Sequence, residues 1–176
     1  MRVVLSVKEL HRIAGSMRRE EFVRQLGPFV LIQRPPDQQK QLKALQLGAK
    51  RTVAVKRGDT PDEVSLLFEF DDLMVATLPT VDSTAPLNVG RMPDCDLVID
   101  DPSVSKHHAR IEWDGTEARV EDLKSSNGTR INGDDLHMKM IVRDGDTISF
   151  GETQFCYLAT HTLHSRLTTG KFKAGV

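Results

Sequence analysis

The chain has 176 residues, of which 39% are hydrophobic and 5% aromatic, and its net charge is −1. This length fits one domain, or one domain with an extension, and can bury a core without covalent or metal cross-links. The two cysteines, Cys95 and Cys156, are therefore expected to be free thiols in a reducing compartment. The N-terminus lacks the apolar stretch of a secretory signal, and the apolar runs fall far short of the roughly 20 residues of a membrane span. These features predict a cytoplasmic protein with no membrane partner.

Charge is distributed unevenly along the sequence. Residues 1–63 carry a net charge of +6, residues 64–160 carry −10, and residues 161–176 carry +3. Binding to nucleic acid requires a clustered basic face, so we do not expect the acidic middle section to bind it. The basic first section leaves that question open.

The first section, residues 1–63, is predicted to be a basic and largely helical extension. Ser6 and Glu9 have the spacing of a capping box, and apolar residues recur at helical intervals directly after Ser6. Further helices are expected over about residues 17–26 and 37–47, each followed by a glycine.

From about residue 51 the pattern changes to short apolar segments separated by turn residues, which is typical of strands. The expected strands cover residues 53–55, 66–70, 73–78, 87–90, 97–99, 109–113, 118–123, 129–131, 138–142, 147–150 and 154–158. Many short strands at this spacing predict an antiparallel sandwich or barrel. Residues 161–176 show no periodicity and are predicted to be a flexible tail.

Three polar clusters lie where predicted strands end or begin. They are Gly90-Arg91, Ser105-Lys106-His107-His108 and Ser126-Asn127-Gly128-Thr129. Together they offer a guanidinium, an ammonium, hydroxyls and an amide, with glycines that allow backbone N–H groups to approach a ligand. This set of groups suits a phosphate.

These clusters, in this order and approximate spacing, resemble the forkhead-associated (FHA) domain family over about residues 64–160. The resemblance implies a mainly β fold, a twisted antiparallel β-sandwich of the SMAD/FHA type with an N-terminal helical extension. It also implies that loops at one end of the sandwich bind a phosphothreonine-containing segment of a protein partner. Phosphothreonine presents about −1.5 to −2 charges and three acceptor oxygens.

The resemblance also assigns a role to each matching residue. Arg91, Ser105 and Lys106 are expected to donate to the phosphate, and Ser126 to contact the phosphothreonine. Asn127 is expected to hold the main chain of the ligand just beyond it. The positions expected to shape or brace the loops are Gly90, His108 and Gly128.

Neither an enzyme nor a metal or cofactor site is expected. Ser105 has His108 nearby in sequence, but it lacks a nucleophile elbow and an orienting acid. His107 and His108 are adjacent in a predicted strand, so they point to opposite faces and do not easily share one ion.

The sequence therefore predicts a bacterial signalling adaptor that binds phosphothreonine in a pathway of a Ser/Thr protein kinase. A further hypothesis is self-association, in which phosphorylated Thr60 occupies the pocket of the same or a neighbouring chain. Two alternatives remain open: a phosphate-independent scaffold between proteins, and a DNA-binding regulator that uses the N-terminal helices.

Overall fold

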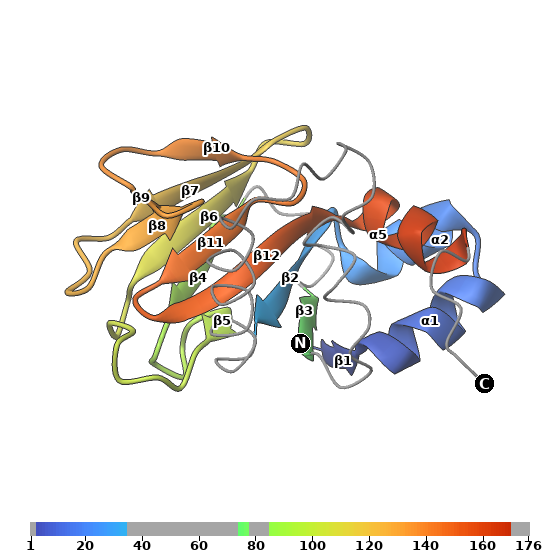
Figure 1. Ribbon diagram of the computed structural model, residues 1–176, viewed down its shortest axis with the longest axis horizontal. Coiled ribbons are helices and arrows are strands. Elements are labelled where there is room, and N and C mark those ends of the chain that lie inside the picture. Colours follow the sequence, from blue (N-terminus) through green and yellow to red (C-terminus); the bar gives the residue numbers. More distant parts are fainter. Residues whose placement is uncertain (1–2, 35–73, 78–84, 170–176) are drawn as a thin grey trace, which may run out of the picture.

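A computed structural model describes residues 3–34, 74–77 and 85–169. In these residues, two β-sheets lie toward one end of the molecule and three helices gather at the other (Figure 1). The helices are α1 (Val7–Ser16), α2 (Arg19–Leu26) and α5 (Thr160–Thr168). The strands are β1 (Val3–Ser6), β2 (Phe29–Arg34), β3 (Met74–Thr77), β4 (Leu87–Gly90), β5 (Leu97–Val98), β6 (Ala109–Trp113), β7 (Ala118–Asp122), β8 (Thr129–Ile131), β9 (Asp134–Asp135), β10 (Met140–Val142), β11 (Thr147–Phe150) and β12 (Thr153–Ala159).

The larger sheet has the strand order β1-β3-β2-β12-β11-β8-β9, and the smaller sheet has the order β10-β7-β6-β4-β5. Strands β4 and β5 run parallel, whereas the other neighbours, such as β6 with β7 and β11 with β12, are antiparallel. The loops that follow β4, precede β6 and precede β8 carry the three polar clusters. Both sheets therefore contribute to the position of these clusters.

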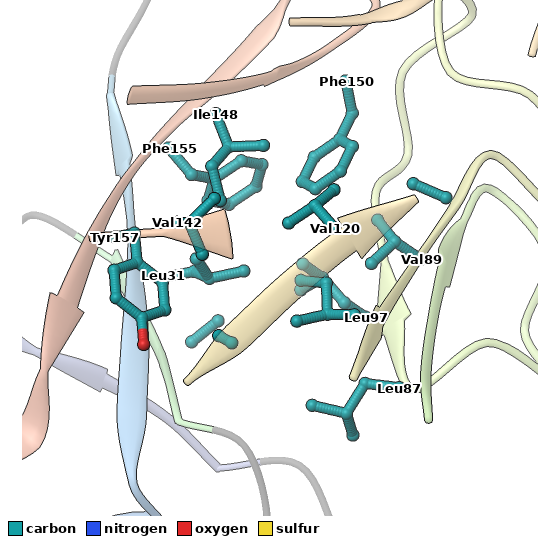
Figure 2. Packing of buried hydrophobic residues seen from close by; sticks show 14 of the residues in the cluster. Leu31, Leu87, Val89, Leu97, Val120, Val142, Ile148, Phe150, Phe155 and Tyr157 are labelled. Carbon is teal, nitrogen blue, oxygen red and sulfur yellow. The ribbon is translucent and has the colours of Figure 1, made fainter. Parts of the chain in front are cut away.

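The space between the sheets is filled by alternate residues of the facing strands. Figure 2 shows Ile148 and Phe155 of the larger sheet opposite Val89 and Val120 of the smaller one. All four are at most 3% exposed. Burial of an aliphatic or aromatic side chain of this size contributes about 1.5–3 kcal/mol to stability. The prediction of a mainly β sandwich is confirmed.

A second core lies between the helices and the other face of the larger sheet. Leu10 of α1, Phe22 of α2 and Leu163 of α5 pack against Val30 of β2 and Leu158 of β12, and all are fully buried. Because β2 and β12 have a buried core on each face, they carry apolar residues at consecutive positions instead of alternating ones. These two strands join the two cores.

The start of α1 has the predicted capping box. The Ser6 hydroxyl accepts the Glu9 backbone N–H at 3.3 Å, and the Ser6 backbone N–H donates to Glu9 Oε2 at 2.9 Å. The bond from the Ser6 backbone N–H, followed by a 2.9 Å bond from the Ser6 hydroxyl to the same carboxylate oxygen, lowers the pKa of Glu9. At the end of α2, Gly27 adopts a φ of 87° and donates its N–H to the Val23 carbonyl, so the predicted glycine stop is confirmed.

Two expectations about the ends of the chain differ from the structure. Residues 161–168, assigned by sequence to a flexible tail, belong to α5 (Thr160–Thr168), whose Leu163 and Leu167 are buried in the second core. Within the predicted helical extension, residues 29–34 form β2, which pairs with β12 along Phe29 to Arg34. The helix expected at 37–47 and the strands expected at 53–55 and 66–70 lie outside the described residues.

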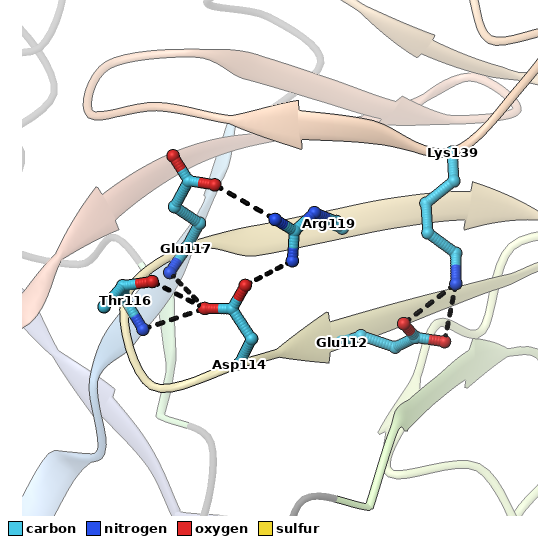
Figure 3. Close-up of polar contacts among 6 residues, drawn as sticks. All are labelled: Glu112, Asp114, Thr116, Glu117, Arg119 and Lys139. Atoms are coloured by element: carbon cyan, nitrogen blue, oxygen red, sulfur yellow. Dashed lines mark hydrogen bonds and ion pairs between the residues drawn. The ribbon is translucent and has the colours of Figure 1, made fainter.

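Polar contacts secure the β6–β7 hairpin on its solvent side (Figure 3). The Asp114 carboxylate accepts from the backbone N–H groups of Thr116 and Glu117 at 2.9 Å each, and it pairs with the Arg119 guanidinium. The bond from the Glu117 backbone is the largest cause of the strongly lowered pKa of Asp114. On the same sheet, Lys139 bonds to Glu112 at 2.8 Å, next to the strand pair β10–β7. The Asp114 contacts fix the turn between β6 and β7, and the Lys139–Glu112 pair joins the residue before β10 to β6.

Among the described residues, no helix is both long and apolar enough to cross a membrane.

Candidate functional site

The three polar clusters meet at one end of the sandwich. The residues before β6 and before β8, together with the residue after β4, line a depression of about 430 Å³. Its lining residues are Arg91, Pro102, Ser103, Val104, Ser105, Lys106, His107, Ser126 and Asn127. This set contains all five residues predicted to bind phosphothreonine, two cations among them, and it contains no carboxylate. The depression is a positive spot on an acidic body.

Arg91 is held in the wall of this depression by the loop that precedes β6. Its Nε donates to the Val104 carbonyl at 3.3 Å, and its backbone N–H donates to the Ser105 carbonyl at 3.0 Å. The Nε bond leaves the two terminal nitrogens of the exposed guanidinium as donors for a ligand. A planar pair of donors of this kind matches two oxygens of a phosphate.

Ser105 and Ser126 bring two hydroxyls to the same wall from different loops. The Ser126 backbone N–H donates to Ser105 Oγ at 3.0 Å, and the two Oγ atoms are 3.5 Å apart. Because Ser105 Oγ accepts the backbone bond, its own proton can turn toward an anion in the depression.

Asn127 is anchored across the depression to a residue that the sequence analysis missed. Its Nδ2 donates to the Ser103 carbonyl at 2.7 Å. Ser103 is fixed in turn, because its backbone N–H and hydroxyl both donate to Asp101 Oδ1, at 2.8 and 2.6 Å. The hydroxyl bond is the main cause of the lowered pKa of Asp101. The pattern Asp101-Pro102-Ser103, with an acid two residues before a serine, is the sequence signal that could have identified this turn.

His108 lies under the depression and is fully buried. Its Nδ1 accepts the Ser105 backbone N–H at 3.0 Å, so the remaining ring nitrogen, Nε2, carries the proton that faces the Gly128 carbonyl at 3.1 Å. Burial lowers the pKa of His108, which favours this neutral form. The ring thus connects the loop before β6 to the loop before β8, and it contacts the backbone of Ser105 instead of activating its hydroxyl.

The two glycines occupy positions with different restrictions. A Cβ atom on Gly90 would lie 2.2 Å from the Lys106 carbonyl oxygen, so only glycine lets the end of β4 approach that loop. Gly128 has a φ of 75°, in the left-handed region that favours glycine.

Comparison with known proteins shows which families and proteins this chain is similar to. The family model of the FHA domain matches residues 87–151. The transcriptional regulatory protein EmbR of Mycobacterium tuberculosis is 29% identical over 142 residues, which are 81% of this chain and 36% of that protein. The glycogen accumulation regulator GarA of Mycolicibacterium smegmatis is 34% identical over 71 residues, which are 40% of this chain and 44% of that protein.

Among solved structures, one from an analysis of phosphothreonine-dependent FHA domain interactions is 32% identical. It covers 43% of this chain and 78% of the other, with a TM-score of 0.41. The chain spans about a third of the length of EmbR and less than half of that of GarA.

Proposed function

Residues 87–151 of this chain belong to the forkhead-associated domain family, and on that premise we propose that the chain binds a phosphothreonine-containing segment of a protein partner. In this proposal it acts without catalysis, as an adaptor in a pathway of a Ser/Thr protein kinase.

One observation carries the proposal: Arg91, Lys106, Ser105 and Ser126 line a single depression that contains no carboxylate. A dianionic phosphate with three acceptor oxygens needs this combination of cations and neutral donors. Charge-assisted hydrogen bonds contribute about 1.5–3 kcal/mol each, and a micromolar complex needs about 8 kcal/mol after the cost of ordering a peptide. A few such bonds are therefore enough for a reversible switch.

Each residue has a distinct part in this proposal. The Arg91 fork takes two phosphate oxygens, Lys106 adds a mobile point charge, and Ser105 donates its hydroxyl. Ser126 contacts the phosphothreonine from the loop opposite Ser105. Asn127, held by the Ser103 carbonyl at 2.7 Å, presents the rest of its amide to the main chain of the ligand.

The test compares wild type and Arg91→Ala in binding to degenerate peptide libraries that carry phosphothreonine, phosphoserine or no phosphate. Wild type is expected to select phosphothreonine, and Arg91→Ala to bind at least roughly a hundredfold more weakly, since two charge-assisted bonds are lost. Arg143→Ala, which removes an exposed cation outside the depression, is the matched control and should bind like wild type. Equal binding by wild type and Arg91→Ala would contradict the proposal.

Different results separate the alternatives. A phosphate-independent scaffold would bind its partner equally well with Arg91→Ala. A DNA-binding regulator would instead show steeply salt-dependent binding to duplex DNA that requires residues 1–63. Self-association through Thr60 stays a prediction, because Thr60 lies outside the described residues; it requires that Thr60→Ala abolish kinase-dependent self-binding.

A further inference from the structure

A second group of chemically reactive side chains lies beside the depression. Cys95 and Asp94, in the turn after β4, meet His107, in the loop before β6. Cys95 Sγ is 3.7 Å from His107 Nδ1, and Asp94 Oδ2 is 3.8 Å from His107 Nε2. One ligand atom from each residue lies within 4.8 Å of the other two. Thiol, imidazole and carboxylate are the three side-chain types that bind zinc in proteins.

The spacing of Cys95 Sγ and His107 Nδ1 fits one metal ion. In a tetrahedral zinc site, with bonds of about 2.3 Å to sulfur and 2.0–2.1 Å to nitrogen, sulfur and nitrogen are about 3.6 Å apart. The observed separation of Cys95 Sγ and His107 Nδ1 is 3.7 Å. Asp94 Oδ2 faces the other ring nitrogen, Nε2, so the Asp94 side chain, which is 67% exposed, has to leave this contact and rotate toward Nδ1 to become the third ligand.

The backbone around Cys95 holds the thiol in place. Its N–H donates to the Met92 carbonyl at 3.1 Å, and its Sγ lies 3.5 Å from the Lys106 carbonyl oxygen, next to His107. A Cβ on Gly90 would come within 3.0 Å of the sulfur. Glycine at that position thus leaves space for both the thiol and the loop. The cysteine is 7% exposed, whereas the side chains of His107 and Asp94 are 55% and 67% exposed and open a path for an ion.

We propose that Cys95, His107 and Asp94 bind a divalent transition-metal ion of the zinc type, with water as the fourth ligand. On binding, the Cys95 thiol loses its proton to solvent and the thiolate bonds to the metal. The sulfur and imidazole ligands favour zinc or cobalt over magnesium and calcium, which prefer oxygen ligands. This proposal departs from the expectation of no metal, in which His107 was weighed only together with His108. Both ring nitrogens of His108 bond to the backbones of Ser105 and Gly128, whereas His107 lies next to Cys95.

The site is tested with Co²⁺ added to the reduced full-length protein, because a cobalt–thiolate bond gives its own near-ultraviolet charge-transfer band. Wild type is expected to develop this band with one ion per chain, to lose it when Zn²⁺ is added, and to release one proton per ion. Cys95→Ser should abolish the band. His107→Gln and Asp94→Asn, both at exposed positions, should weaken cobalt binding at least roughly tenfold.

Matched controls are Cys156→Ala, which removes the other thiol, and His161→Gln, which removes an exposed histidine on α5. Both should keep the band and the wild-type affinity. The proposal is overturned if wild type shows no band, if the band persists in Cys95→Ser, or if folded His107→Gln binds cobalt as tightly as wild type. Phosphopeptide binding plays no part in this test, so either proposal can fail without the other.

Discussion

At the scale of single residues, His108 connects the binding loops and makes their stability depend on pH. Its buried ring accepts from the Ser105 N–H through Nδ1 and donates to the Gly128 carbonyl through Nε2, an arrangement that only the neutral ring can make. Burial lowers the pKa of His108 below the ordinary value of 6.5. The unfolded chain therefore takes up this proton more readily than the folded one.

The contribution of the neutral His108 ring to stability should be complete above about pH 6.5 and should fall as the pH drops toward the lowered pKa. Urea unfolding from pH 7.5 to 5 measures this. His108→Gln keeps a donor for Gly128 but loses the acceptor for Ser105, so it should cost about 1–3 kcal/mol at pH 7.5 and flatten the pH dependence. His161→Gln is the control and should keep the wild-type slope. A wild-type slope in His108→Gln would contradict the prediction.

Because Gly90 has no side chain, the end of β4 lies closer to the Lys106 carbonyl than any other residue would allow. In Gly90→Ala the new methyl group would meet the Lys106 carbonyl oxygen at 2.2 Å, and backbone atoms cannot easily move away. Overpacking of this kind costs about 1–3 kcal/mol or more, and it should displace the loop that carries Ser105 and Lys106. Gly15→Ala in α1 is the matched control: its methyl group meets nothing within 4 Å and should stabilise the helix by about 0.5–1 kcal/mol. Equal melting temperatures of the two variants would contradict this account.

At the scale of elements, α5 is a structural part of the second core. Leu163 is fully buried against the helices and the larger sheet, so Leu163→Ala should lower the free energy of unfolding by about 2–5 kcal/mol. The matched control is Met138→Ala, at a side chain that is 74% exposed, and it should change stability by no more than about 0.5 kcal/mol. Chemical denaturation of both variants decides whether this helix stabilises the fold, and equal stability would show that it does not.

The elements that the sequence predicted correctly are those with a strong local signal. The capping box at Ser6, the glycine at position 27 and the alternating residues of β6 and β7 each depend on nearby residues only. By contrast, β2 has a buried core on each face, and its apolar run shows no alternation. The helix α5 presents only Leu163 and Leu167 as buried apolar residues among threonines, histidines and serines, so its periodicity is weak. Tertiary packing, which a local pattern does not contain, determines both elements.

The sequence likewise predicted one part of the candidate site and missed another. The resemblance predicted Arg91, Ser105, Lys106, Ser126 and Asn127, and the structure brings all five to one depression. It did not predict Ser103 as the anchor of Asn127, nor the meeting of Cys95 with His107. Those contacts join residues from different loops, so they depend on how closely β4 and the loop before β6 approach each other.

At the scale of the whole molecule, the strands β2 and β12 couple the two cores. Phe29 and Leu31 of β2 face the sandwich core, whereas Val30 and Ile32 face the helices. Neither core can lose this strand without exposing the other. The described parts of the chain should therefore unfold as one cooperative unit.

This cooperativity has two independent probes. Trp113, the one tryptophan of the sequence, packs against the sandwich core with its ring 5.9 Å from that of Phe29, so its fluorescence reports on that core. Helical circular dichroism reports on α1, α2 and α5, which surround the second core. The two signals should give the same denaturant midpoint and the same free energy of unfolding. Midpoints that differ beyond error would show that the helices separate from the sandwich.

The pairing of β2 with β12 also determines when the larger sheet can form during synthesis. The ribosome releases β2 before its partner, which emerges roughly 120 residues later, and closing so long a loop is entropically costly. Pairings between segments so distant in sequence form slowly. Until β12 arrives, β2 can pair only with β3, so its other backbone edge has no native partner, which is a risk of aggregation. The larger sheet should therefore be complete only after β12 has left the ribosome.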